Sequence, residues 1–161
     1  MTEASPAVDI RPVATVDDLD AAKRLFRAYA DSLDFDLCFQ GFDDELGSLP
    51  GRYAPALRGA LLLGYVDGAP VGVVGLRDLG DGICEMKRLY IDPAGRGRNL
   101  GRLLAEAVVA EGRRLGYRAM RLDTIRSMVA ANRVYDALGF RDIPPYYDNP
   151  LPEVRYREVD L

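Results

Sequence analysis

The segment from Gly95 to Gly101 combines residue types that suit phosphate binding: its sequence is Gly-Arg-Gly-Arg-Asn-Leu-Gly. Glycine admits positive φ and lets another group approach closely, and arginine adds positive charge with planar donor geometry. Apolar residues at helical spacing follow, so the segment stands where a helix begins. Because a helix N-terminus presents free N–H groups and a partial positive charge, the pattern predicts an anion site, most naturally for phosphate.

Considered alone, this segment also allows alternatives to a phosphate site. Structural glycines with merely solvent-exposed arginines would account for it equally well. Gly95, Gly97 and Gly101 are spaced as G-x-G-x-x-x-G, which is close to a dinucleotide fingerprint but weak evidence for one. The phosphate loop of nucleotide hydrolases is disfavoured because no Gly-Lys-Ser/Thr follows.

Composition narrows the class of protein. The chain has 161 residues, 48% of them apolar and 29% charged, which is typical of a single globular domain spanning 1–161. Its net charge of −4, without a basic cluster, argues against nucleic acid as a partner. No apolar stretch is long enough to span a membrane and the N-terminus does not resemble a signal peptide, so we expect a cytoplasmic protein.

The chain contains no histidine, which removes several catalytic schemes at once. Ser-His-Asp and Cys-His catalysis, histidine general bases and histidine-ligated metals all become impossible. Cys38 and Cys84 are too few and too isolated for a zinc site. We therefore expect no metal, and any general base has to be acidic.

Turn and periodicity signals predict the order β-α-α-β-β-β-α-β-α-β-β. The expected strands cover 9–13, 60–66, 70–79, 83–91, 119–124, 140–143 and 154–160. Thr15 with Asp18 predicts a capping box for the first helix, and Ser127 is expected to cap the last helix, over 128–138. The strand at 119–124 follows a long helix, so it should lie parallel to the strand at 83–91. A doubly wound nucleotide fold would alternate strand and helix from its first phosphate loop, so this order disfavours a dinucleotide site.

Two stretches resemble the GNAT superfamily of acyl-CoA-dependent N-acyltransferases. Leu89 to Gly101 is similar to its pyrophosphate loop, Arg/Gln-x-x-Gly-x-Gly/Ala, with Asn99 in place of the first glycine. Asparagine tolerates a left-handed backbone, so we expect the loop to persist. Ala131 to Phe140 resembles the segment Ala-x-x-x-Tyr-x-x-x-Gly-Phe, although Met128 stands where many relatives have asparagine.

The resemblance implies an α/β protein of the α+β type, with a mixed central sheet flanked by helices. It implies acetyl-CoA as co-substrate, a primary amine of a small molecule or peptide as acceptor, and Tyr135 as the acid that protonates the departing thiolate. The residues expected along the cofactor are Leu89, Tyr90, Ile91, Arg96, Gly97, Arg98, Asn99, Leu100, Gly101, Arg102, Met128 and Asn132. A non-catalytic acyl-CoA-binding or regulatory module on the same fold is the alternative, and a homodimer is left open.

Two strand carboxylates are candidates for the base. Glu85 shares a strand face with Lys87 and Leu89 if the strand alternates regularly. Asp123 lies in the parallel neighbour. Structural pairing with a nearby lysine or arginine would account for either carboxylate, since a buried charge needs a partner; of the two we favour Glu85 as the base.

Two loops are expected near the acceptor. Tyr146, Tyr147 and the aromatic segment 35–42 could line its rim. Plain packing against the core is the preferred interpretation of both loops.

Overall fold

The computed structural model describes residues 7–37 and 40–161, and the element order is the expected one. The helices are α1 (Val16–Ser32), α2 (Phe42–Ser48), α3 (Leu100–Arg114) and α4 (Val129–Ala137). The strands are β1 (Val8–Pro12), β2 (Ala60–Val66), β3 (Ala69–Gly80), β4 (Ile83–Ile91), β5 (Ala119–Ile125), β6 (Arg141–Ile143) and β7 (Val154–Asp160). Short 3₁₀ helices occupy Gly51–Tyr53, Pro55–Leu57 and Pro93–Gly95.

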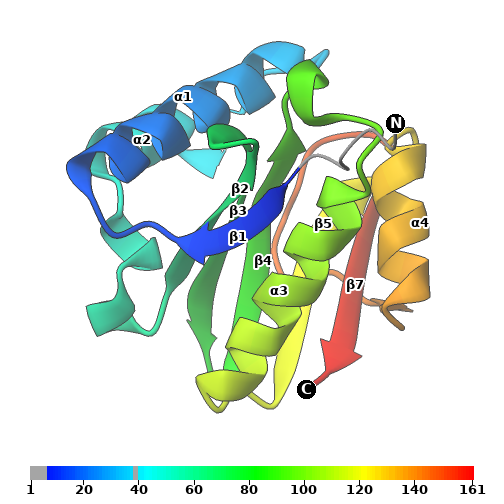
Figure 1. Ribbon diagram of the computed structural model, residues 1–161. Helices are drawn as coiled ribbons and strands as arrows, with labels where there is room; N and C mark the ends of the chain where they lie inside the picture. The colour runs from blue at the N-terminus through cyan, green and yellow to red at the C-terminus, as the bar shows by residue number, and fades with distance from the viewer. Residues whose placement is uncertain (1–6, 38–39) are drawn as a thin grey trace.

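The strands form one seven-stranded sheet in the order β1-β2-β3-β4-β5-β7-β6. Every neighbouring pair is antiparallel except β4 and β5, which are parallel as predicted. The parallel pairing is short: it joins Ile83–Glu85 of β4 to Ala119–Arg121 of β5 and goes no further. The middle of the sheet therefore opens beyond Glu85, as Figure 1 shows for the two strands behind α3.

Helices cover both faces of the sheet (Figure 1). Phe26 of α1 and Phe42 of α2 belong to one buried cluster, together with Leu63 of β2. Leu104 of α3 belongs to a second cluster on the opposite face, which includes Leu62 of β2. All seven residues of β2 are buried because the strand has helices on both sides.

The two helix caps predicted from the sequence have different outcomes. The capping box before α1 is confirmed, because Oγ1 of Thr15 accepts from the N–H of Asp18 while the Asp18 carboxylate accepts from the N–H of Thr15. The Ser127 cap is wrong. The N-cap of α4 is Met128, which makes no side-chain capping bond, because the turn that leaves β5 extends one residue further than the serine signal suggested.

Strand β4 does not alternate regularly. Arg88 has φ of +60°, and the register with β3 shifts between Val73 and Gly75, which marks a β-bulge. As a result Leu89 packs with the cluster under α3, whereas Glu85 faces the other side and pairs with Arg77. The predicted common face of Glu85 and Leu89 is therefore wrong, because the extra residue in the bulge reverses the side-chain direction after Lys87.

Candidate active site

A cleft opens where β4 and β5 separate. Its walls are residues 86–89 of β4 and 122–125 of β5, and side chains from α1, the loop before α2, α4 and the loop before β7 complete it. Beyond Glu85 the edge of β4 that faces β5 has no strand partner. A free strand edge can pair with an extended polar ligand through its N–H and C=O groups.

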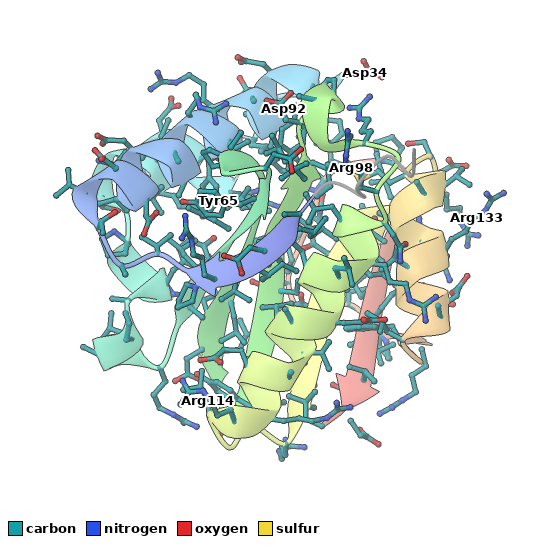
Figure 2. The ribbon with its side chains drawn as sticks, in the orientation of Figure 1. Asp34, Tyr65, Asp92, Arg98, Arg114 and Arg133 are labelled. Carbon is teal, nitrogen blue, oxygen red and sulfur yellow. The ribbon has the colours of Figure 1, made fainter. Side chains whose placement is uncertain are left out.

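The turn before α3 presents a row of free backbone donors. The N–H of Arg96 donates to the carbonyl of Pro93, and the next N–H with a carbonyl partner is that of Leu103, which donates to Asn99. The six N–H groups from Gly97 to Arg102 therefore donate to no described residue. Asn99 has φ of +59° and ψ of +21°, the left-handed conformation expected of it. Successive free N–H groups at a helix N-terminus form an anion-binding concavity. The turn includes the part of the chain between Asp92 and Arg98 in Figure 2.

At two of the three positions of this turn that carry glycine, packing or backbone conformation requires a glycine. At Gly95 an added Cβ would lie 2.6 Å from a methyl carbon of Val71, and Gly97 has φ of +82°. At Gly101 an added Cβ would meet only Ile91, at 3.7 Å, which is an ordinary contact. Packing therefore accounts for Gly95 and backbone conformation accounts for Gly97, while Gly101 leaves open space beside the free N–H groups.

The other residues expected along the cofactor divide into two groups. Leu89 and Met128 line the cleft, and the side chains of Arg96 and Arg98 are exposed on the turn. The remaining members have contacts elsewhere, as follows. Tyr90 packs with the cluster under α1, Ile91 and Leu100 pack with the cluster under α3, Arg102 pairs with Glu106, and the amide of Asn132 donates to the carbonyls of Ile125 and Met128.

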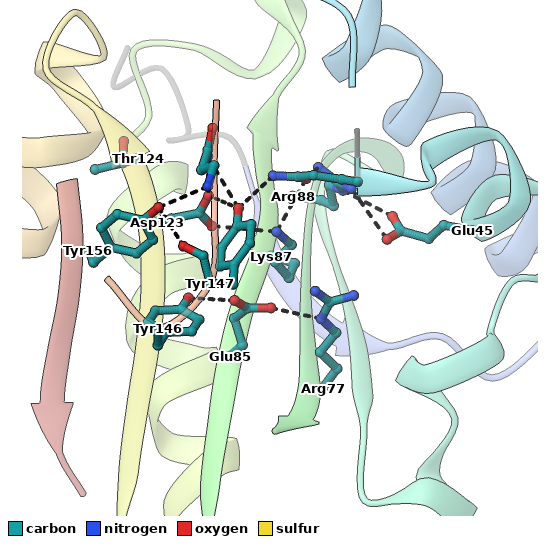
Figure 3. A network of polar contacts seen from close by, with 12 residues as sticks. Glu45, Arg77, Glu85, Lys87, Arg88, Asp123, Thr124, Tyr146, Tyr147 and Tyr156 are labelled. Atoms are coloured by element: carbon teal, nitrogen blue, oxygen red, sulfur yellow. Dashed lines mark hydrogen bonds and ion pairs between the residues drawn. The ribbon is translucent and has the colours of Figure 1, made fainter. Parts of the chain in front are cut away.

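Each candidate base is engaged by its neighbours (Figure 3). Glu85 has a relative exposure of 1%, does not line the cleft, accepts 2.8 Å from Nε of Arg77 and accepts from the hydroxyl of Tyr146. Asp123 does line the cleft, and its side chain is 7% exposed. Burial alone would raise the pKa of Asp123, but the charge of Lys87 and three hydrogen bonds outweigh burial and lower it.

A closed ring of polar contacts surrounds Asp123 (Figure 3). Nζ of Lys87 lies 3.5 Å from Oδ1 of Asp123 and 3.3 Å from Oε1 of Gln40. Nε2 of Gln40 donates 3.0 Å to the hydroxyl of Tyr147, which in turn donates to Oδ2 of Asp123. Asn149 adds a further donor to that oxygen at 2.8 Å. Burial lowers the pKa of Lys87, although Glu85 and Asp123 oppose the shift.

Two phenol groups reach the cleft. Tyr135 of α4 is 7% exposed, and burial raises the pKa of its hydroxyl, so it is a proton donor at neutral pH. Tyr29 of α1 also lines the cleft, and burial raises its pKa as well. Neither hydroxyl has a hydrogen-bond partner in the described chain. Both phenols can therefore donate to a ligand.

Comparison with known proteins decides the family. The sequence model of the Acetyltransferase (GNAT) family matches residues 19–140. The chain belongs to the GNAT acetyltransferase family. It is 37% identical to an uncharacterized N-acetyltransferase of Schizosaccharomyces pombe, over 96% of this chain and 95% of that one.

Solved structures share the fold of this GNAT chain. A Staphylococcus aureus acetyltransferase of the GNAT family has a TM-score of 0.77 at 19% identity and covers 96% of this chain and 99% of its own. A Salmonella typhimurium structure with its cofactor acetyl-CoA has a TM-score of 0.72 at 22% identity, with coverages of 96% and 94%. These likenesses confirm the predicted mixed sheet flanked by helices.

Sequence reasoning missed several residues of the site. Tyr29 fits the apolar stripe of α1, so the sequence gives no sign that its hydroxyl reaches the cleft. Gln40, Arg88 and Asn149 carry no recognisable motif. Of the aromatic segment expected at the rim, Phe35 lines the cleft and Phe42 is buried under α1, while Cys38 and Phe39 lie outside the described residues. Tyr146 and Tyr147 pack against Tyr156, and their hydroxyls donate hydrogen bonds to Glu85 and Asp123, respectively.

The described residues contain neither a candidate metal centre nor a membrane-spanning helix. No group of three or more His, Cys, Asp or Glu side chains in 7–37 and 40–161 is placed to hold a metal ion. Within the same residues no helix has the length and apolar character that crossing a bilayer requires.

Proposed function

We propose that this GNAT chain transfers an acetyl group from acetyl-CoA to a primary amine of a small molecule or peptide. The observation that carries the proposal is the succession of three features along β4 and the turn that follows it. The six free N–H groups before α3, the unpaired edge of β4 and the cleft with Tyr135 follow one another in the order that a pyrophosphate, an extended arm and a thioester would need.

The residues of this chain suit acetyl-CoA. The free N–H groups of Gly97 to Arg102 would hold the pyrophosphate, with Arg96 and Arg98 adding charge from the exposed side of the turn. The open edge of β4 would pair with the amide groups of the pantetheine arm. When bound, acetyl-CoA supplies the acetyl group as a thioester.

Proton transfer is assigned to three side chains of the chain. Asp123 is the carboxylate at the cleft wall, so it would draw an ammonium group and accept its proton, directly or through water. Glu85 is the alternative base, although it does not line the cleft. The hydroxyl of Tyr135 would give its proton to the sulfur that leaves, because a thiolate shielded from water needs a donor.

Coenzyme release during incubation with acetyl-CoA and a panel of primary amines tests the proposal. We expect amine-dependent release of free thiol above the rate without amine. A parallel measurement of the melting temperature with saturating acetyl-CoA reports binding alone. Stabilisation without release by any amine would favour the non-catalytic acyl-CoA-binding module, and no stabilisation would remove acetyl-CoA as the ligand.

A further inference from the structure

A second cavity, of about 230 Å³, lies beside the cleft, between α2, the 3₁₀ helix Gly51–Tyr53 and β3. Gln40 lines both the cavity and the cleft. The ion pair between Arg88, which lines the cleft, and Glu45, which lines the cavity, separates the two spaces. The cavity opens to solvent beside the exposed residues Ser48 and Arg52.

Tyr53 brings an unpaired hydroxyl to this cavity. The residue is 2% exposed, and its hydroxyl is buried without a hydrogen-bond partner. The ring cannot move aside easily, because it packs edge-on to Phe26 and fills the space over Gly75, where an added Cβ would lie 2.5 Å from a ring carbon. Burial raises the pKa of the phenol and the nearby Glu45 raises it further, so the phenol remains protonated. An orphaned buried donor is rare and requires an explanation.

Arg77 brings unused donors to the same cavity. Its Nε donates to Glu85, but its two terminal nitrogens make no hydrogen bond within the described protein, and its side chain is 20% exposed. Figure 3 shows these nitrogens on the side of Arg77 that faces the Arg88–Glu45 pair. Glu45 is already occupied by Arg88, with contacts of 3.0 and 3.3 Å. Arg77 therefore has donors to spare and Glu45 does not compete for them.

The charges around the cavity favour a singly charged anion. Of the residues that line the cavity, Arg52 and Arg77 are positive and Glu45 is negative, which leaves a formal charge of +1. A guanidinium presents parallel N–H donors that match a planar carboxylate. A dianion such as a phosphate would meet the negative charge of Glu45 with less compensation.

We propose that this cavity is a subsite for a carboxylate, bound by the terminal nitrogens of Arg77 and by the hydroxyl of Tyr53. The carboxylate would belong either to the acceptor, whose chain passes Gln40 from the cleft, or to a separate small acid that binds beside the acceptor. The first source rests on the proposed acetyl transfer, and the second does not.

The experiment pairs ligands that differ only in the carboxylate. Acceptors are ω-amino acids of two to five methylenes and the alkylamines of the same length, compared by kcat/KM for coenzyme release. Binding without acetyl-CoA is measured by calorimetric titration with succinate and with its neutral diamide. The variants are Tyr53→Phe and Arg77→Lys, with Tyr117→Phe as the matched control, because the Tyr117 hydroxyl has a partner, the carbonyl of Arg58, at 2.7 Å.

We expect Tyr53→Phe to melt no lower than the wild type, because it removes a hydroxyl without a partner. In the same variant, the preference for the ligand with the carboxylate over the ligand without it should fall roughly ten- to a hundredfold. A fall of this size is the expected effect of losing one hydrogen bond to a charged group. Arg77→Lys should weaken the preference while it keeps the charge beside Glu85. Tyr117→Phe should leave the preference unchanged.

The outcomes separate the sources and the two proposals. A Tyr53-dependent preference among acceptors assigns the carboxylate to the acceptor. Tyr53-dependent binding of succinate without such a preference assigns it to a separate acid. Succinate binding in a protein that releases no coenzyme with any amine keeps the subsite and rejects acetyl transfer. If neither assay shows a carboxylate preference that depends on Tyr53, the subsite is overturned.

Discussion

Nζ of Lys87 on β4 and Oδ1 of Asp123 on β5 form an ion pair of 3.5 Å across the gap where their strands have separated. Both side chains are almost fully buried, with exposures of 4% and 7%. No backbone hydrogen bond joins β4 to β5 at this level, because their pairing ends at Glu85 and Arg121. The ion pair therefore connects the two walls of the cleft.

Asp123→Asn should destabilise the protein strongly. It removes the ion-pair partner of the buried Lys87, and breaking a buried pair in this way typically costs about 3–5 kcal/mol. Urea unfolding measures the change. The control is Glu106→Gln, which breaks the exposed pair with Arg102 and should cost under about 1 kcal/mol. Lys87→Met combined with Asp123→Asn should recover much of the loss, and equal costs for Asp123→Asn and Glu106→Gln would contradict the role of the buried pair.

The same pair predicts how stability depends on pH. The pKa of Asp123 is lowered in the folded protein, so its carboxylate contributes stability that is fully present above the unfolded pKa of about 3.9 and is lost as the pH falls through the folded pKa. The free energy of unfolding of wild type and Asp123→Asn should differ by a constant amount between about pH 5 and 7 and converge below about pH 4. A gap that persists unchanged to about pH 2 would show that Asp123 acts through packing and not through charge.

The local elements of this fold could be predicted well from sequence. β2, β4 and β7 have the predicted bounds. For β2 and β4, runs of branched and aromatic residues are bounded by Gly and Asp, and for β7 the prediction came from alternation of side chains. The parallel pair β4–β5 followed from the helix that joins the two strands. Hydrophobic periodicity and turn residues are local signals, so the order of helices and strands can be predicted where both signals are strong.

The interior of the site could not be predicted in the same way. The bulge at Arg88 places an arginine at positive φ, and what holds it there is its contact with Glu45 and Gln40 from α2 and the preceding loop. The ring around Asp123 joins segments as distant as Gln40 and Tyr147, which are 107 positions apart. Such contacts depend on how elements pack, and no periodicity in the sequence encodes them.

Gly101 offers a test of the anion turn. Gly101→Ala should bind acetyl-CoA nearly as the wild type does, since its Cβ meets only Ile91 at 3.7 Å. Gly101→Glu should abolish binding, because it places a negative charge beside the free N–H groups. The measurement is the shift in melting temperature at acetyl-CoA about 100 times the dissociation constant, where the wild type should gain about 2.7 kcal/mol. Normal stabilisation of Gly101→Glu would mean that the turn does not hold the pyrophosphate.

Asp123→Asn and Glu85→Gln should separate the two candidate bases, assayed below the unfolding temperature of each variant. The variant that neutralises the base should lose the rise of rate with pH and about 10²–10⁴-fold in kcat, with acetyl-CoA binding close to normal. We expect this of Asp123→Asn, because Asp123 lines the cleft and Glu85 does not. If neither variant slows turnover by even a few-fold, the amine arrives neutral or loses its proton to water.

Tyr135→Phe should lower kcat with little change in KM for acetyl-CoA. The change keeps the aromatic ring, whose centroid lies 5.7 Å from that of Phe140. It removes only the hydroxyl, which has no hydrogen-bond partner among the described residues. A donor that acts mainly in the transition state affects kcat and leaves ground-state binding intact. By analogy with the loss of one oxyanion donor, we expect a fall on the order of 10²-fold.

Tyr29→Phe is the matched control for Tyr135→Phe. Tyr29 also lines the cleft with a phenol whose pKa is raised by burial, but it lies on α1, whereas Tyr135 lies on the helix that follows β5. A proton donor to the sulfur has to lie at the thioester, which the proposed arrangement places between β4 and α4. Tyr29→Phe should therefore change KM for the amine more than kcat. If, with chemistry shown to be rate-limiting, Tyr135→Phe turns over at the wild-type rate while Tyr29→Phe does not, the acid is Tyr29 and the thioester lies closer to α1 than to α4.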